Sequence, residues 1–172
     1  MRPFPLPLHP LKAIITLMGH LIMILWTTWA FAQGTHIELT TVAEVEKEVL
    51  NAAGQKTIQR IPATSILPGE TVIFITHYRN TGTKVAENAV ITNPIPEHMI
   101  FQRGSASGVN TVITYSIDGG KSYHKPEELI VVDKAGRRFP ARPQDFTHIR
   151  WKFVKSLPPG AAGNVSFRAT LR

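Results

Sequence analysis

Side chains that could carry chemistry are present in this chain, but they do not stand at the spacings that catalytic or metal sites use. Cysteine is absent from all 172 residues, so thiolate catalysis and cysteine-ligated zinc are excluded. The sequence contains no His-x-His or His-Glu-x-x-His pair, no Gly-x-Ser-x-Gly elbow and no glycine-rich phosphate loop. The histidines beyond residue 32 are isolated: His36, His77, His98, His124 and His148. We therefore predict no catalytic, cofactor-binding or metal-binding residue, and a protein that is not an enzyme.

Residues 116–123 read Ser-Ile-Asp-Gly-Gly-Lys-Ser-Tyr and resemble the Asp-box pattern Ser-x-Asp-x-Gly-x-Thr-Trp. In sialidase-like propellers this pattern braces a hairpin, and the chain is too short to form a propeller. Asp118 can accept hydrogen bonds from its own turn, and Gly119 and Gly120 permit positive φ. The pattern predicts a braced hairpin turn and gives no support to glycosidase activity.

A group of basic residues near the C-terminus could bind an acidic polymer. Aromatic residues alternate with it on the segment 146–153, and Trp151 has the parity of a core residue while Arg150 and Lys152 have the opposite parity. One interpretation is a polyanion site for acidic polysaccharide, lipopolysaccharide phosphate or, as the least expected of the three, nucleic acid. The other is a solvated sheet face that blunts edge pairing. The group comprises Arg137, Arg138, Arg142, Arg150, Lys152 and Lys155.

The segment 67–101 predicts the strands that must position these groups. Pro68-Gly69 is a turn pair, because proline presets φ and glycine accepts the positive φ that follows. From Glu70 the chain alternates, with Val72, Phe74, Thr76 and Tyr78 on one face of an extended strand. The strand should end at the turn signal Asn80-Thr81-Gly82, and Asn93-Pro94-Ile95-Pro96 forms a later corner.

These three motifs, in this order, resemble the conserved repeat domain of bacterial surface proteins called domain of unknown function 11. In that family a Pro-Gly-acidic-Thr turn, a strand ending in Asn-Thr-Gly and an Asp/Asn-Pro-hydrophobic-Pro corner recur. The resemblance implies an immunoglobulin-like β-sandwich displayed outside the cytoplasm, and it attaches no activity to the chain.

The opposite face of the same strand carries Ile73 and Ile75, which are apolar where a solvated sheet face would be polar. Either an N-terminal hairpin covers them, or they form a docking face for a neighbouring subunit. The second interpretation predicts a homo-oligomer.

Residues 1–32 resemble an export signal, with Arg2 and Lys12 before a largely apolar segment and Ala30-Phe31-Ala32 as a small-x-small cleavage site. The competing interpretation is an uncleaved anchor, which would be the only membrane contact, because the apolar segment approaches the length of a spanning helix. Both place the remaining chain outside the cytoplasm, in the periplasm, at the cell surface or secreted.

Residues 33–66 predict a strand or hairpin extension of the sandwich. The alternation from Ile37 to Val49 places glutamates on one face, where a hairpin would bring them near Lys56 and Arg60. A helix is the alternative, since Thr41-x-x-Glu44 fits a capping box and Gly54 a C-cap.

Eight or nine short strands, with no sustained helical period, predict an all-β, immunoglobulin-like antiparallel sandwich over residues 67–172. The composition is moderately basic, with a net charge of +7. We expect a non-catalytic envelope or cell-surface module that binds a protein or a glycan. The alternative is a basic-face module for acidic polymer.

Overall fold

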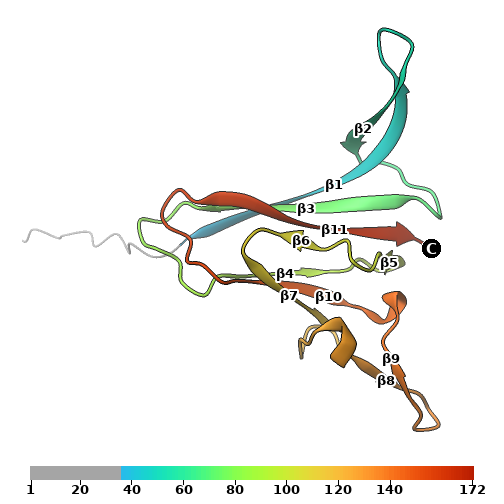
Figure 1. Cartoon of the computed structure of the whole chain (residues 1–172), viewed down its shortest axis with the longest axis vertical. Coiled ribbons are helices and arrows are strands. Elements are labelled where there is room, and N and C mark those ends of the chain that lie inside the picture. The colour runs from blue at the N-terminus through green and yellow to red at the C-terminus, as the bar shows by residue number, and fades with distance from the viewer. Residues whose placement is uncertain (1–35) are drawn as a thin grey trace, which may run out of the picture. The chain divides into compact units, whose positions relative to one another are not determined.

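The computed structural model describes residues 36–172, so the predicted export signal lies outside the described part of the chain. The described part is built from strands and two 3-10 helices (Figure 1). No helix in residues 36–172 has the length and apolar character needed to cross a membrane. The elements in chain order are β1 (Ile37–Leu50), β2 (Lys56–Pro62), β3 (Thr71–Asn80), β4 (Val90–Pro94), β5 (Met99–Phe101), β6 (Ser107–Gly108), β7 (Thr111–Ser116), η1 (Pro126–Glu128), β8 (Ile130–Val132), β9 (Arg138–Pro140), η2 (Pro143–Asp145), β10 (His148–Phe153) and β11 (Ala162–Leu171).

The strands form an antiparallel, immunoglobulin-like β-sandwich, which confirms the predicted fold class. The large sheet has the order β2-β1-β3-β11-β5, with β6 also paired to β11. The small sheet has the order β4-β10-β7, and β8 and β9 form a separate ribbon. β10 and β11 are consecutive in sequence but lie in different sheets, so the C-terminal half of the chain ties the two layers together.

β1 is the longest strand of the described chain because it serves two partners in succession. Its residues 37–45 pair with β3, and its residues 44–50 pair with β2. We call β2 and residues 46–50 of β1 the arm; it curves away from the two sheets in Figure 1. The predicted hairpin is therefore correct and the helical alternative is wrong. Glu48 binds Lys56 and Glu46 binds Arg60 across the arm, as the alternation indicates.

The core lies between the two sheets and is rich in aromatic side chains. Trp151 is fully buried in the centre of β10 and lies against Phe167 of β11, with ring centroids 6.3 Å apart. Tyr78 meets Phe153 edge-on at 4.9 Å. The strand parities that predicted Val72 and Trp151 as core residues are correct, because an alternating strand can bury only one of its faces against the opposite sheet.

The polar residues of the three turn motifs hold the sandwich together by hydrogen bonds within the chain. Glu70 accepts the backbone N–H of Leu67 at 2.8 Å and pairs with Lys47 of β1. Asn80 is buried, and its amide donates to the carbonyls of Lys84 and Leu157. These side-chain hydrogen bonds satisfy backbone groups that have no partner strand where the chain turns.

Asn93 links the two layers of the sandwich. Its side-chain amide donates to the buried hydroxyl of Thr76 on β3 at 2.6 Å, and the Thr76 hydroxyl also lies 2.8 Å from that of Thr41 on β1. The buried Thr76 hydroxyl therefore has partners in both sheets.

Candidate interaction surfaces

The outer face of the large sheet contains the two isoleucines that the sequence marks as unusual. The register places Ile73 directly between Glu44 of β1 and Arg168 of β11 on this outer face. Ile73 is nevertheless only 3% exposed. Ile75, two residues further along the strand, is half-buried.

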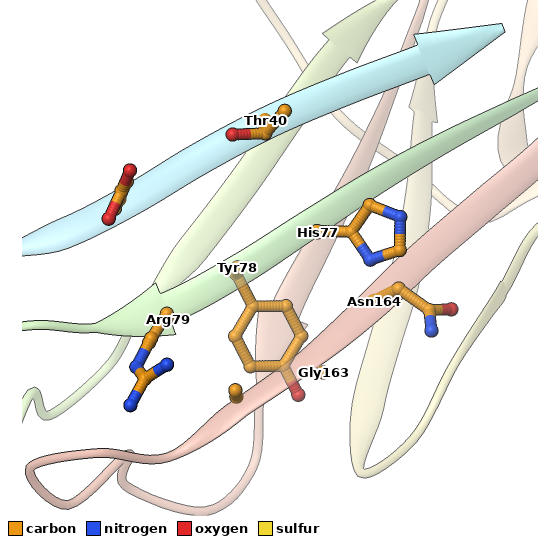
Figure 2. Close-up of a pocket in the computed structure, with 8 residues that line it drawn as sticks. Thr40, His77, Tyr78, Arg79, Gly163 and Asn164 are labelled. Carbon is orange, nitrogen blue, oxygen red and sulfur yellow. The ribbon is translucent and has the colours of Figure 1, made fainter.

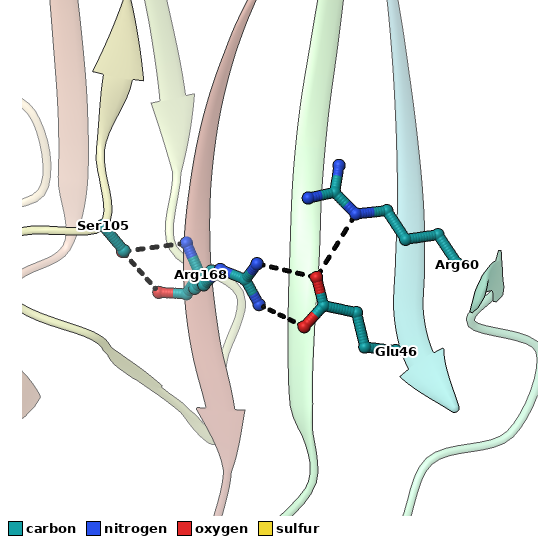
Figure 3. A network of polar contacts seen from close by, with 4 residues as sticks. All are labelled: Glu46, Arg60, Ser105 and Arg168. Carbon is teal, nitrogen blue, oxygen red and sulfur yellow. Dashed lines mark hydrogen bonds and ion pairs between the residues drawn. The ribbon is translucent and has the colours of Figure 1, made fainter. Parts of the chain in front are cut away.

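An ion pair across β3 accounts for the burial of Ile73. Arg168 donates two hydrogen bonds to the Glu46 carboxylate, Nη2 to Oε1 at 2.8 Å and Nη1 to Oε2 at 3.1 Å (Figure 3). Arg60 of β2 donates its Nε to the same carboxylate at 3.3 Å. The bond from Arg168, ahead of that from Arg60, holds the pKa of Glu46 below its ordinary value, and the pKa of Arg168 is raised.

The N-terminal hairpin thus covers Ile73 with side chains of its strands, while its backbone continues the large sheet as β1 and β2. Ser105 holds the backbone of β11 in place, because the N–H of Arg168 donates to the Ser105 hydroxyl at 2.9 Å (Figure 3). Burial within the chain explains an apolar residue at position 73. The docking role of Ile73 and Ile75 stays a prediction.

A shallow hollow of about 430 Å³ lies on the same sheet, towards the start of β1 (Figure 2). Gly163 lies in this lining directly against Tyr78, and a Cβ at this position would come within 2.5 Å of the Tyr78 hydroxyl. Burial raises the pKa of Tyr78. The hollow brings together one imidazole, one carboxylate, one guanidinium and the hydroxyls of Thr40 and Tyr78. Its lining comprises Glu38, Thr40, His77, Tyr78, Arg79, Ala162, Gly163 and Asn164.

The Asp-box segment forms the predicted brace. Asp118 accepts hydrogen bonds from the hydroxyls of Ser116 and Ser122, each at 2.6 Å, and from the backbone N–H of Lys121 and Ser122 at 3.0 Å. The hydroxyl bonds, from Ser116 first and then Ser122, hold the pKa of Asp118 far below its ordinary range. Both of its carboxylate oxygens thus accept bonds from the turn.

The structure does not gather the six basic residues of the predicted polyanion site. Arg137 pairs with Asp133 at 2.7 Å beside the β8-β9 ribbon, and Arg142 pairs with Asp145 at 3.4 Å in η2. Arg138 is exposed on β9. The three arginines come before the start of β10, whereas Lys155 comes after its end. Only Arg150 and Lys152, two residues apart on β10, share one face.

Tyr123 is a partner of Arg150 that sequence reasoning missed. The guanidinium carbon of Arg150 lies 3.4 Å from the centroid of the Tyr123 ring, at the end of the Asp-box segment. The sequence does mark Tyr123 as the aromatic residue that ends the Asp-box pattern. It does not show which strand this ring lies against, because that depends on the fold.

Within residues 36–172 no group of three or more histidine, aspartate and glutamate side chains is arranged to hold a metal ion. Comparisons with known protein families, with curated proteins and with solved structures find no match for this chain. The resemblance to the surface-protein repeat therefore stays a prediction.

Proposed function

We propose that this protein is a non-catalytic interaction module of the cell envelope or cell surface, and that it binds a protein partner by pairing with the free edge of β2. The observation that carries this proposal is the arm, in which β2 has β1 on one side and, within residues 36–172, no strand on the other. A partner's extended segment can add to such an edge through main-chain hydrogen bonds.

The hydrogen-bond pattern of the hairpin identifies the groups that the edge offers. Backbone bonds join Asn51 to Gln55 at one end and Ala63 to Ala43 at the other, both at 2.9 Å. Antiparallel pairs alternate between bonded and non-bonded. Between these ends, the residues that turn their N–H and C=O groups away from β1 are therefore Lys56, Ile58 and Arg60, in the register observed.

The side chains of the arm support the same proposal. Ile58 is 73% exposed and Leu50 is 68% exposed, and both lie on the face that carries Glu48 and Lys56. A two-stranded ribbon with exposed apolar residues gains little stability from its own burial. A partner that covers Ile58 while bonding to its backbone would stabilise both surfaces.

The remaining parts of the proposal rest on the sequence. The signal-like residues 1–32 support export to the periplasm, the cell surface or the medium, and the turn motifs support kinship with a surface-protein repeat. We propose no cofactor and no reaction. The partner that the arm fits best is an envelope protein with an unpaired strand.

The test compares Ile58→Pro with Ile58→Thr in affinity capture from envelope extracts, with partners identified by mass spectrometry. Proline removes the N–H that faces the free edge without removing a bond to β1, whereas threonine keeps this donor. We expect the captured partner to be lost with proline and largely retained with threonine. Equal capture by the parent and Ile58→Pro would contradict edge pairing.

A further inference from the structure

The outer face of the small sheet carries basic side chains, and the Asp118 carboxylate that binds Ser116 at its edge is engaged by its own turn. The register places nine residues on this face, and every one with a formal or titratable charge is basic. On the large sheet, by contrast, Arg168 is bound to Glu46. The nine are Val90, Thr92 and Pro94 of β4, His148, Arg150 and Lys152 of β10, and Val112, Thr114 and Ser116 of β7.

Arg150 is fixed in place, yet it has no anion. Its guanidinium stacks on Tyr123, and its Nε is buried without a hydrogen-bond partner. Arg150 as a whole is half-buried on β10. No carboxylate of residues 36–172 lies within ion-pair distance of Arg150, although Arg60, Arg137 and Arg142 each have one. A planar guanidinium held by stacking loses little entropy when it binds a carboxylate or sulfate through two bonds.

The neighbours of Arg150 and Lys152 add the features of a sugar-binding face. Thr92 and Thr114 lie on either side of Arg150 in the register and provide hydroxyls. Val90 and Val112 lie on either side of Lys152, and each is 47% exposed. Arg150 and Lys152 are about 6.7 Å apart along the strand.

We propose that this face binds an acidic polysaccharide, with Arg150 holding a carboxylate or sulfate group, Lys152 a neighbouring anion, and the valines the apolar face of a sugar ring. Tyr123 acts as a positioning residue for Arg150. This proposal is independent of the β2 edge, which lies in the other sheet.

A single-stranded nucleic acid fits the face less well. Proteins that bind single strands stack the bases on aromatic side chains. Among the described residues on and above this face, Tyr123 and His148 have rings on which a base could stack, and one face of the Tyr123 ring is already covered by Arg150. A polymer recognised through anionic groups and hydroxyls suits the surface better.

The experiment measures binding of the full chain to polygalacturonate by isothermal titration at low salt, with neutral dextran and a thymidine oligonucleotide as comparison ligands. We expect binding to polygalacturonate, a loss of about tenfold in affinity for Arg150→Gln, and a smaller loss for Lys152→Gln. The matched control is Arg79→Gln, which removes an exposed arginine from the other sheet. Tyr123→Ala should weaken binding less than Arg150→Gln, and Arg150→Lys should not restore it fully.

Three results would overturn the proposal: no binding to polygalacturonate, an equal loss for Arg79→Gln, or tighter binding of the oligonucleotide with the same dependence on Arg150. The last would replace the polysaccharide with nucleic acid. Circular dichroism checks that each variant is folded. If Arg150→Gln fails this check, Lys152→Gln decides, because Lys152 is exposed and its loss leaves the core intact.

Discussion

Arg168 of β11 and Glu46 of β1 are 122 positions apart in sequence, and their two-bond ion pair spans β3 and covers Ile73. The pair links three neighbouring strands of the large sheet on a face that solvent would otherwise reach. Its geometry is more favourable than that of an ordinary surface pair, because both terminal nitrogens of the guanidinium and both carboxylate oxygens take part.

Replacing Arg168 with alanine should destabilise the fold, since the substitution removes the ion pair and exposes Ile73. We expect the thermal midpoint to fall by a few degrees. Arg168→Lys should recover only part of the loss, because a lysine ammonium cannot form the paired bonds. Calorimetry of both variants beside Arg79→Ala is the measurement. An equal effect of Arg79→Ala would show that position 168 has no special role.

Acid should weaken the fold through Asp118. Its folded-state pKa lies well below its ordinary value of 3.8, mainly because of the Ser116 and Ser122 hydroxyls. The stabilising contribution is therefore complete above the unfolded-state pKa and is lost as the pH falls through the folded-state pKa. Asp118→Asn should be less stable than the parent at pH 7, and this difference should shrink below about pH 4. Thermal melts from pH 7 to pH 2 measure it; a difference that stays constant over this range would contradict the assignment.

Glu46, Glu70 and Asp133 also have lowered pKa values, because each accepts hydrogen bonds within the chain, from Arg168, Lys47 and Arg137 respectively among other donors. Protonation of these three carboxylates should lower the free energy of unfolding, as protonation of Asp118 does. The parent protein should therefore lose stability steadily as the pH falls. The Asp118→Asn comparison isolates one residue from this common trend.

Asn80→Ala should cost about 2–4 kcal/mol of unfolding free energy, because it removes the side-chain bonds to the carbonyls of Lys84 and Leu157 and to the N–H of Gly82. These backbone groups cannot all find water where Asn80 is buried. Chemical denaturation measures the change. Asn164→Ala, at an exposed position of β11, is the control, and it should change the unfolding free energy by less than about 0.5 kcal/mol.

Gly163→Ala should destabilise the protein by about 1–3 kcal/mol, because the added methyl group would meet the Tyr78 hydroxyl at 2.5 Å and the ring carbon next to it at 2.8 Å. The double variant with Tyr78→Phe should recover part of this loss by removing the closest atom. Chemical denaturation of the two single variants and the double variant gives the coupling free energy between positions 163 and 78. Strict additivity would contradict the contact.

Local patterns were sufficient for the fold class, for the strand parities and for the turns. The alternation in β3 and β10 assigned Val72 and Trp151 to the core, and the Asp-box segment predicted its own brace. Each of these features depends on residues within a few positions of one another, because a strand alternates every two residues and a turn is closed by its own side chains.

What covers Ile73, what orients Arg150 and which strand edge stays free were decided by the tertiary structure. The sequence by itself determined that Ile73 points away from the core, but Arg168 reaches it only because β11 pairs with β3. The same sequence places Arg137 and Arg150 close together along the chain, and the fold separates them into a ribbon and a sheet face. The order and register of strands depend on packing over the whole chain, so these neighbours follow from the assembled sheets and not from local spacing.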